Sequence, residues 1–212
     1  MRKRLTVRAL LCVSLVAVAL AASVVVVSAR TRYRADSFLR EIVRLQLRSS
    51  SFAQVRDVMT KYGAKSLSSG CDSGACSYTV EFKNTWLHRL HLAPLTRLSC
   101  TLNVKNDGLV LKGCQYFTDD MAGVGASVWE TMQPHPTVKE SCYVQREFIP
   151  RSAGPDIRYR VFVFLTPDAS ADEHRAAFGM NPRCLAKIGG CEDPLALLPT
   201  VPWGEQAMTH HC

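Results

Sequence analysis

The sequence lacks the short motifs that mark most enzymes, metal proteins and nucleic-acid-binding proteins. None of its cysteines forms a C-x-x-C pair, so zinc-ribbon and thioredoxin-like folds lose their main support. It contains no internal repeat and no low-complexity tract, and its basic residues after position 30 are scattered, which leaves no footprint for nucleic acid. The glycine-rich stretch 123–127 lacks the spacing of a phosphate loop or a nucleophile elbow, so we predict a flexible connection there. The sequence therefore indicates no cofactor.

Long hydrophobic runs are also scarce, and the one that is present determines how the rest is interpreted. Residues 9–29 carry no charge, and they are preceded by the basic segment 1–8 and followed by Arg30, Arg32 and Arg34. As a helix this run is about 31 Å long at ~1.5 Å per residue, which matches the ~30 Å hydrocarbon core of a bilayer. We predict a transmembrane anchor over residues 9–29, with a cleaved signal peptide as the alternative, since small-residue cleavage sites end at Ala21 and Ala29.

The cysteines decide on which side of the membrane the remaining chain lies. The basic residues on the two sides of the anchor are nearly balanced, so they favour a cytoplasmic N-terminus only slightly. Of the nine cysteines, Cys12 lies inside the anchor and eight follow it. An even number of cysteines beyond a membrane span is typical of an oxidising compartment, so we predict that residues 30–212 lie outside the cytoplasm.

Eight cysteines allow 105 pairings, so most of the connectivity stays open. Cys71 and Cys76 are separated by a short loop that contains Gly74, and we predict that they form a disulfide. We also predict a disulfide between Cys100 and Cys114. No partner is predicted for the remaining four, which are Cys142, Cys184, Cys191 and Cys212.

The periodicity and the turn signals predict an α+β fold in a disulfide-stabilised domain. We expect a helix from Asp36-Ser37 to about Leu47, which continues the membrane helix as one alternative, and a second helix opened by a capping box at Ser51 and Gln54. A C-terminal helix opened by a second capping box is expected over residues 170–179. Between the helices we predict a mainly antiparallel sheet of about five strands, at residues 77–83, 97–105, 109–117, 142–149 and 158–165.

The order of these elements suggests how the chain is divided. Residues 30–118 form a helix-helix-strand module that includes a hairpin, and residues 119–140 form a connection with little regular structure. Residues 141–212 form a second part, with two strands, a helix and a cysteine-rich tail, packed on the same sheet.

The hairpin gives the sharpest structural expectation. Asn106-Asp107-Gly108 suits a three-residue loop with glycine in the left-handed bulge position. In that register the residue numbers of each opposed pair add up to 214, so Lys105 faces Leu109 and Cys100 faces Cys114. Leu98, Leu102 and Val104 share the face of the two cysteines, which makes that face mostly apolar.

Histidines supply the candidate sites. His88 and His91 stand at i and i+3 beside an apolar ridge; as an exported hydrolase the chain would use one of them with a distant acid. Another interpretation of the same ridge is that Trp86, Leu87, Leu90 and Leu92 rest against the membrane interface, helped by Arg89 and Arg97. The C-terminal residues His210, His211 and Cys212 would form the site of a metal-binding domain. Neither histidine set comes with the three or four ligands that zinc needs, so we predict no metal site and leave catalysis open, with binding favoured.

Residues 49–117 resemble the small αα-β module of outer-membrane assembly lipoproteins and β-lactamase-inhibitor-like domains. The likeness rests on the capped helix from Ser51 to Gly63, on Tyr78-Thr-Val-Glu-Phe82, and on Leu102-Asn-Val with Gly108-Leu-Val. The glycine segments that flank the helix in that family are replaced here by Leu47-Arg-Ser and Gly63-Ala-Lys. The resemblance implies a scaffold that binds a protein or an envelope component without catalysis.

Overall fold

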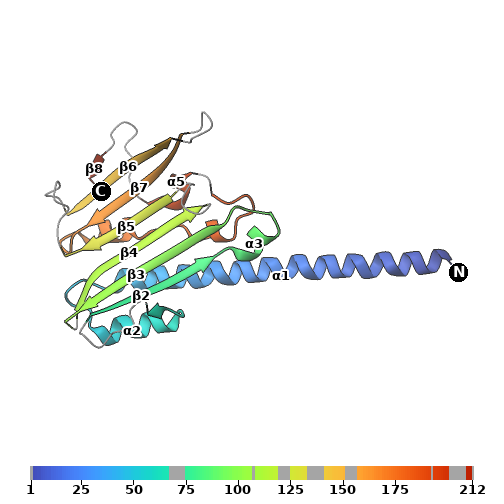
Figure 1. The fold of residues 1–212 in the computed structure, drawn as a ribbon, viewed down its shortest axis with the longest axis horizontal. Helices are drawn as coiled ribbons and strands as arrows, with labels where there is room; N and C mark the ends of the chain where they lie inside the picture. The colour runs from blue at the N-terminus through green and yellow to red at the C-terminus, as the bar shows by residue number, and fades with distance from the viewer. Residues whose placement is uncertain are drawn as a thin grey trace.

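The computed structural model describes residues 2–66, 75–106, 108–118, 125–132, 141–150, 157–191, 193–200 and 209–211. Its first element is a single helix, α1 (Arg2–Arg44), whose N-terminal part extends far beyond the rest of the molecule (Figure 1). Within the described chain, this helix alone is long and apolar enough to cross a membrane. The expected anchor and the first helix of the domain are therefore one continuous element.

The second part of α1 is built into the core of the domain. Ala35, Phe38, Leu39 and Ile42 are buried, and they recur at the spacing that keeps one helical face against a core. The expected helix start at Asp36 is wrong: Asp36 lies inside α1 and forms an i,i+4 ion pair with Arg40. Asp36 and Ser37 can cap a helix, but here they lie within α1 and do not interrupt it.

A short loop leads from α1 to α2 (Phe52–Lys61), and the predicted capping box at its start is confirmed. The Ser51 hydroxyl accepts a hydrogen bond from the Gln54 amide, and the Gln54 side chain accepts one from the Ser51 amide. Val55 and Met59 are buried beneath the helix. Gly63, at φ +80°, allows the chain to turn toward the sheet.

The described residues form one sheet of eight strands in the order β1-β2-β3-β4-β5-β7-β6-β8. β5 and β7 are parallel and the other neighbours are antiparallel, so the expected α+β architecture is confirmed. The five predicted strands are all present, and β5 and two short edge strands are additional. The bounds are β1 (Lys65–Ser66), β2 (Ala75–Lys83), β3 (Thr96–Lys105), β4 (Gly108–Thr118), β5 (Gly125–Thr131), β6 (Cys142–Pro150), β7 (Ile157–Leu165) and β8 (Thr209–His211).

The expected loop over residues 119–140 is wrong where β5 lies. Gly125, Ala126 and Ser127 open this strand, which stands between β4 and β7 near the middle of the sheet. All three residues are buried, and Gly125 lies opposite Phe117 of β4. Glycine and alanine therefore mark close packing here rather than flexibility.

The predicted hairpin is correct in its outer part and wrong at its turn. Lys105 pairs with Gly108 rather than Leu109, so the loop has two residues, and Asn106 takes the left-handed conformation at φ +51°. A bulge between Asn103 and Val104 then shifts the register by one residue. Beyond it, Cys100 faces Cys114, as predicted, and the two form a disulfide with a Cα–Cα distance of 4.0 Å.

Four other described cysteines also form disulfides. Cys184 and Cys191 are bonded to each other, and Cys76 and Cys142 are also disulfide-bonded. Cys71, the predicted partner of Cys76, lies outside the described residues, as does Cys212, so that prediction stays open. Cys12 is the free cysteine of the described chain.

The helices pack on one face of the sheet. α1 crosses behind β2 and β3 in Figure 1, and α2 contacts β2, β3 and β4. After β7 the chain forms α4 (Ala171–Ala177), the 3-10 turn η2 (Pro182–Leu185) and α5 (Pro194–Leu197). The predicted second capping box, Ser170 with Glu173, opens α4. α3 (Thr85–Arg89) links β2 to β3 at the end of the domain from which α1 projects.

The opposite face of the sheet carries a row of half-buried side chains. Gly113, Trp129, Phe164 and Tyr143 are successive cross-strand neighbours on β4, β5, β7 and β6. The Trp129 ring lies directly over Gly113, where an added Cβ would come within 2.1 Å of it. Phe164 also stacks with Tyr143 and with Phe162. This face is consequently held together by aromatic packing rather than by a described helix.

Candidate functional site: a groove between α1 and α4

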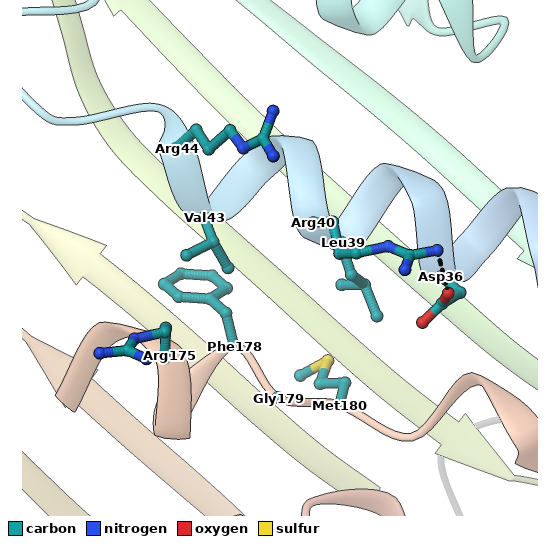
Figure 2. Close-up of a pocket in the computed structure, with 9 residues that line it drawn as sticks. All are labelled: Asp36, Leu39, Arg40, Val43, Arg44, Arg175, Phe178, Gly179 and Met180. Atoms are coloured by element: carbon teal, nitrogen blue, oxygen red, sulfur yellow. Dashed lines mark hydrogen bonds and ion pairs between the residues drawn. The ribbon is translucent and has the colours of Figure 1, made fainter. Parts of the chain in front are cut away.

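The described surface is hollowed where the last turns of α1 pass the segment from α4 to Met180. A groove of about 600 Å³ opens there, and a second pocket of about 360 Å³ adjoins it toward the end of α1. Val43 and Arg175 line both. Figure 2 shows the groove, whose lining residues are Asp36, Leu39, Arg40, Val43, Arg44, Arg175, Phe178, Gly179 and Met180. We call this surface the α1–α4 groove.

The floor of the groove is apolar and its rim is basic. Leu39 and Val43 project from α1 toward Phe178 and Met180, and the Phe178 ring lies against Val43 in Figure 2. Three arginines and one aspartate stand on the rim. Arg40 is ion-paired with Asp36 and Arg175 with Asp172 of α4, so the positive charge of the rim is partly balanced by these two aspartates. An amphipathic and acidic ligand is the chemistry that this surface matches.

Behind the groove, the second pocket ends on a buried charge network. Its lining includes Leu45 and Leu47 from the end of α1, Glu130 from β5, and His174 from α4. Lys112 lies beneath them on β4, and the sheet register makes it the direct cross-strand neighbour of Glu130. Neither side chain exposes more than 1% of its surface.

The contacts within this network join three parts of the fold. The Lys112 ammonium lies 2.7 Å from Glu130 Oε2 and donates a 2.7 Å hydrogen bond to the Leu45 carbonyl, which follows the last residue of α1. His174 Nε2 lies 3.3 Å from Glu130 Oε1, and its Nδ1 lies 2.9 Å from the Ser170 carbonyl oxygen. Lys112 also lies 4.6 Å from the centre of the Phe178 ring. The end of α1, the sheet and α4 are therefore connected at one point.

The electrostatics of the network follow from burial and pairing. The hydrogen bond to Glu130 raises the pKa of His174, against the opposing effect of burial. Burial lowers the pKa of Lys112, while the Glu130 charge opposes that shift. For Glu130, burial raises the pKa, but His174 and Lys112 outweigh it and the net pKa is lowered. The Glu130 carboxylate thus pairs with the buried Lys112 ammonium and favours the protonated form of His174.

This arrangement suits a structural link better than acid–base chemistry. Both nitrogens of His174 face oxygen acceptors, so the protonated ring satisfies both and no lone pair is left to accept a proton. The described residues that line the groove and the second pocket include no serine, threonine, cysteine or tyrosine that could act as a nucleophile.

The histidines singled out from the sequence lie elsewhere. His88 and His91 are exposed at α3, and neither belongs to the groove or the second pocket. His210 and His211 belong to β8, where they pair with Val144 and Tyr143 of β6, and Cys212 lies outside the described residues. Among the residues that the structure describes, no three metal-ligating side chains come together.

Sequence reasoning missed the network and the groove. One signal was visible: Lys112 falls on the predicted inner face of the hairpin, opposite Leu102, where a charge needs a buried partner. That partner, Glu130, lies on β5, which the sequence analysis treats as a loop because its first residues are small. The groove depends on how α4 packs against α1, and no local pattern encodes that contact.

Comparison with known protein families, with curated proteins and with solved structures finds no match. The resemblance of residues 49–117 to the assembly-lipoprotein module accordingly stays a hypothesis.

Proposed function

We propose that this chain is a single-pass membrane protein whose residues 30–212 form a binding domain outside the cytoplasm. The domain binds a protein partner in the α1–α4 groove, through an acidic amphipathic segment of that partner, and carries out no catalysis. The observation that carries the proposal is the groove itself, with its apolar floor between Leu39 and Phe178 and its basic rim at Arg44 and Arg175.

The anchor is supported by the continuity of α1. The helix runs without interruption from its exposed apolar part into the core at Ala35 and Phe38. A helix that must bury one segment in a protein core and expose a long apolar segment in the other finds a suitable environment for the second only in lipid. The disulfides of the domain favour the oxidising side of the membrane.

The position of the groove restricts the kind of partner. Asp36 follows the end of the apolar segment at Ala29 by seven residues, or about 10 Å along the helix at ~1.5 Å per residue. Arg44 lies about 12 Å further along. A partner seated in the groove consequently lies close to the membrane surface, as would a segment of another membrane protein or of an envelope component.

Site-specific photo-crosslinking in the membranes of the natural host tests the proposal. A photoreactive amino acid in place of Arg44 leaves Arg40 and Arg175 on the rim to hold the partner. It is expected to give one discrete protein adduct, whose crosslinked peptide is rich in acidic and apolar residues. The matched control is the same replacement at Lys105, which is exposed beside the hairpin turn and outside the groove. The double substitution R40E/R175E should abolish the adduct formed at position 44, and K105E should not.

Two results would contradict the proposed binding. One is equal labelling at positions 44 and 105, which would indicate random encounters. The other is an adduct at position 44 that survives R40E/R175E unchanged, because a partner held by the basic rim cannot tolerate reversal of its charge.

A further inference from the structure

A cluster of exposed apolar side chains lies outside the groove and outside the apolar part of α1. Trp86 and Leu90 are each 49% exposed, Leu92 is 39% exposed and Ile188 is 69% exposed. Trp86 belongs to α3, Leu90 and Leu92 follow it, and Ile188 comes from the loop after η2. That loop is joined to the first segment by a 2.8 Å hydrogen bond from the Gly189 amide to the Leu92 carbonyl. We call these four residues the α3 patch.

The α3 patch occupies the end of the domain from which the apolar part of α1 projects (Figure 1). α3 and η2 both contact α1. Burial along α1 begins at Ser28, which is 7% exposed and lies one residue before the end of the charge-free segment. The domain therefore starts where the membrane span ends, with no linker between them.

The continuous helix also fixes the distance between the α3 patch and the membrane. A flexible linker would let the domain move away from the membrane, whereas α1 passes from span to core as one helix without a break. α3 is held at the base of that helix, so its exposed side chains stay at the level of the lipid headgroups. Water-facing tryptophan and leucine are costly in solution, but the same side chains are favourable in the interfacial layer of a bilayer.

The charges around the patch have the sign that a lipid surface attracts. Arg89 lies 5.9 Å from the Trp86 ring centre, and Lys187 precedes Ile188. Residues 85–95 and 186–190 contain no acidic residue. Arg30, Arg32 and Arg34 follow the span on α1 itself. Tryptophan with leucine and flanking basic residues is the composition of segments that lie in the membrane interface.

We infer that the α3 patch docks into the headgroup layer of the membrane that α1 spans, so that the domain rests on the bilayer instead of standing free on its helix. Docking gives the domain a second contact with the membrane besides α1, and this contact fixes the rotation of the domain about the axis of α1. The α1–α4 groove is then presented to partners in one orientation. This inference rests on the proposed anchor and is independent of what the groove binds.

The experiment uses the full chain in lipid nanodiscs and reads tryptophan emission. Discs are made from phosphatidylcholine with a minor share of anionic phosphatidylglycerol, with either ordinary or dibrominated acyl chains, since bromine quenches tryptophan on contact. We expect brominated lipid to quench the wild-type chain and the quenched component to be lost in W86F. The matched control is W129F, because Trp129 lies over Gly113 on the sheet and is expected to be out of reach of lipid.

A second variant tests the patch without removing the probe. L90S/I188S keeps Trp86 and alters only exposed positions, and it should reduce quenching by at least half. L195S, at an exposed leucine outside the patch, should leave quenching unchanged. Equal quenching of wild type and W86F, with the chain still bound to the discs, would overturn the docking alone. A chain that elutes separately from the discs would instead overturn the anchor. Neither result bears on binding in the α1–α4 groove, which the crosslinking experiment tests.

Discussion

Lys112 and Glu130 face each other directly across β4 and β5, with 2.7 Å between the ammonium nitrogen and a carboxylate oxygen, and both side chains are buried. Removing Lys112 leaves the buried Glu130 carboxylate with His174, 3.3 Å from its other oxygen, as its remaining described partner. We predict that K112M lowers the free energy of unfolding by about 3–5 kcal/mol. Urea denaturation of the full chain in detergent measures this.

The double variant K112M/E130L is the informative control for that prediction. It replaces the charge pair with apolar side chains of similar volume, so it should be clearly more stable than K112M alone. If the double variant is as unstable as the sum of the two single variants, the ion pair is not what stabilises this part of the core.

His174 is expected to make stability depend on pH. Its pKa is raised in the folded protein from 6.5, chiefly by the hydrogen bond to Glu130, so its contribution is complete below pH 6.5. That contribution is lost as the pH rises through the folded pKa, because the ring then gives up the proton that it shares with Glu130. The wild-type chain should therefore become less stable as the pH rises above 6.5, and H174Q should lose much of this dependence. An unchanged slope in H174Q would contradict the role of the pair.

Gly113 and Trp129 form a packing pair on the other face of the sheet. A Cβ at position 113 would overlap the Trp129 ring, so G113A must displace that ring. We predict a loss of about 1–3 kcal/mol for G113A. In the W129L background the same substitution should cost markedly less, which a double-mutant cycle measures. Equal costs in the two backgrounds would show that the ring is not what excludes the methyl group.

The hairpin turn depends on the left-handed conformation of Asn106, at φ +51°. A β-branched side chain is disfavoured there, so N106V should destabilise the domain by about 1–2 kcal/mol, whereas N106G should be close to neutral. Thermal unfolding of the two variants compares them. A neutral N106V would indicate that the turn rearranges to the three-residue loop that the sequence suggests.

The sequence predicts those elements whose signals are local. The capping boxes at Ser51 and Ser170 fix the starts of α2 and α4, because each satisfies its own backbone amides within one turn. The alternation around Cys100 and Cys114 fixes the register of β3 and β4 over most of their length. A one-residue error there would bring polar side chains into the core.

The failures share a physical cause, which is competition from contacts distant in sequence. At the hairpin turn, the loop is one residue shorter than predicted. A bulge next to Val104 compensates for the missing residue, so the strand register beyond the bulge is the predicted one. At β5, Gly125 is buried opposite Phe117 of β4, which only the fold brings close. Asp36 could have capped a helix, but the core contacts of Phe38 and Ile42 keep α1 continuous through it.

The candidate site was less predictable than the fold for the same reason. Lys112 was identifiable as a charge on an apolar face, but its partners come from β5 and α4, and the groove requires α4 to lie against α1. Conversely, His88 and His91 were candidate site residues because of their i,i+3 spacing alone. Spacing cannot distinguish an exposed turn from a pocket, and the structure places both at the surface.

The most direct test of the account is the side of the membrane on which the domain lies. A reporter that is active only in the cytosol should be silent when it is fused after Cys212. The same reporter fused before the apolar segment, after Arg8, should be active, which shows that the chain is made and inserted. Strong activity from the fusion after Cys212 would contradict the anchor, the extracytoplasmic location and the binding function together.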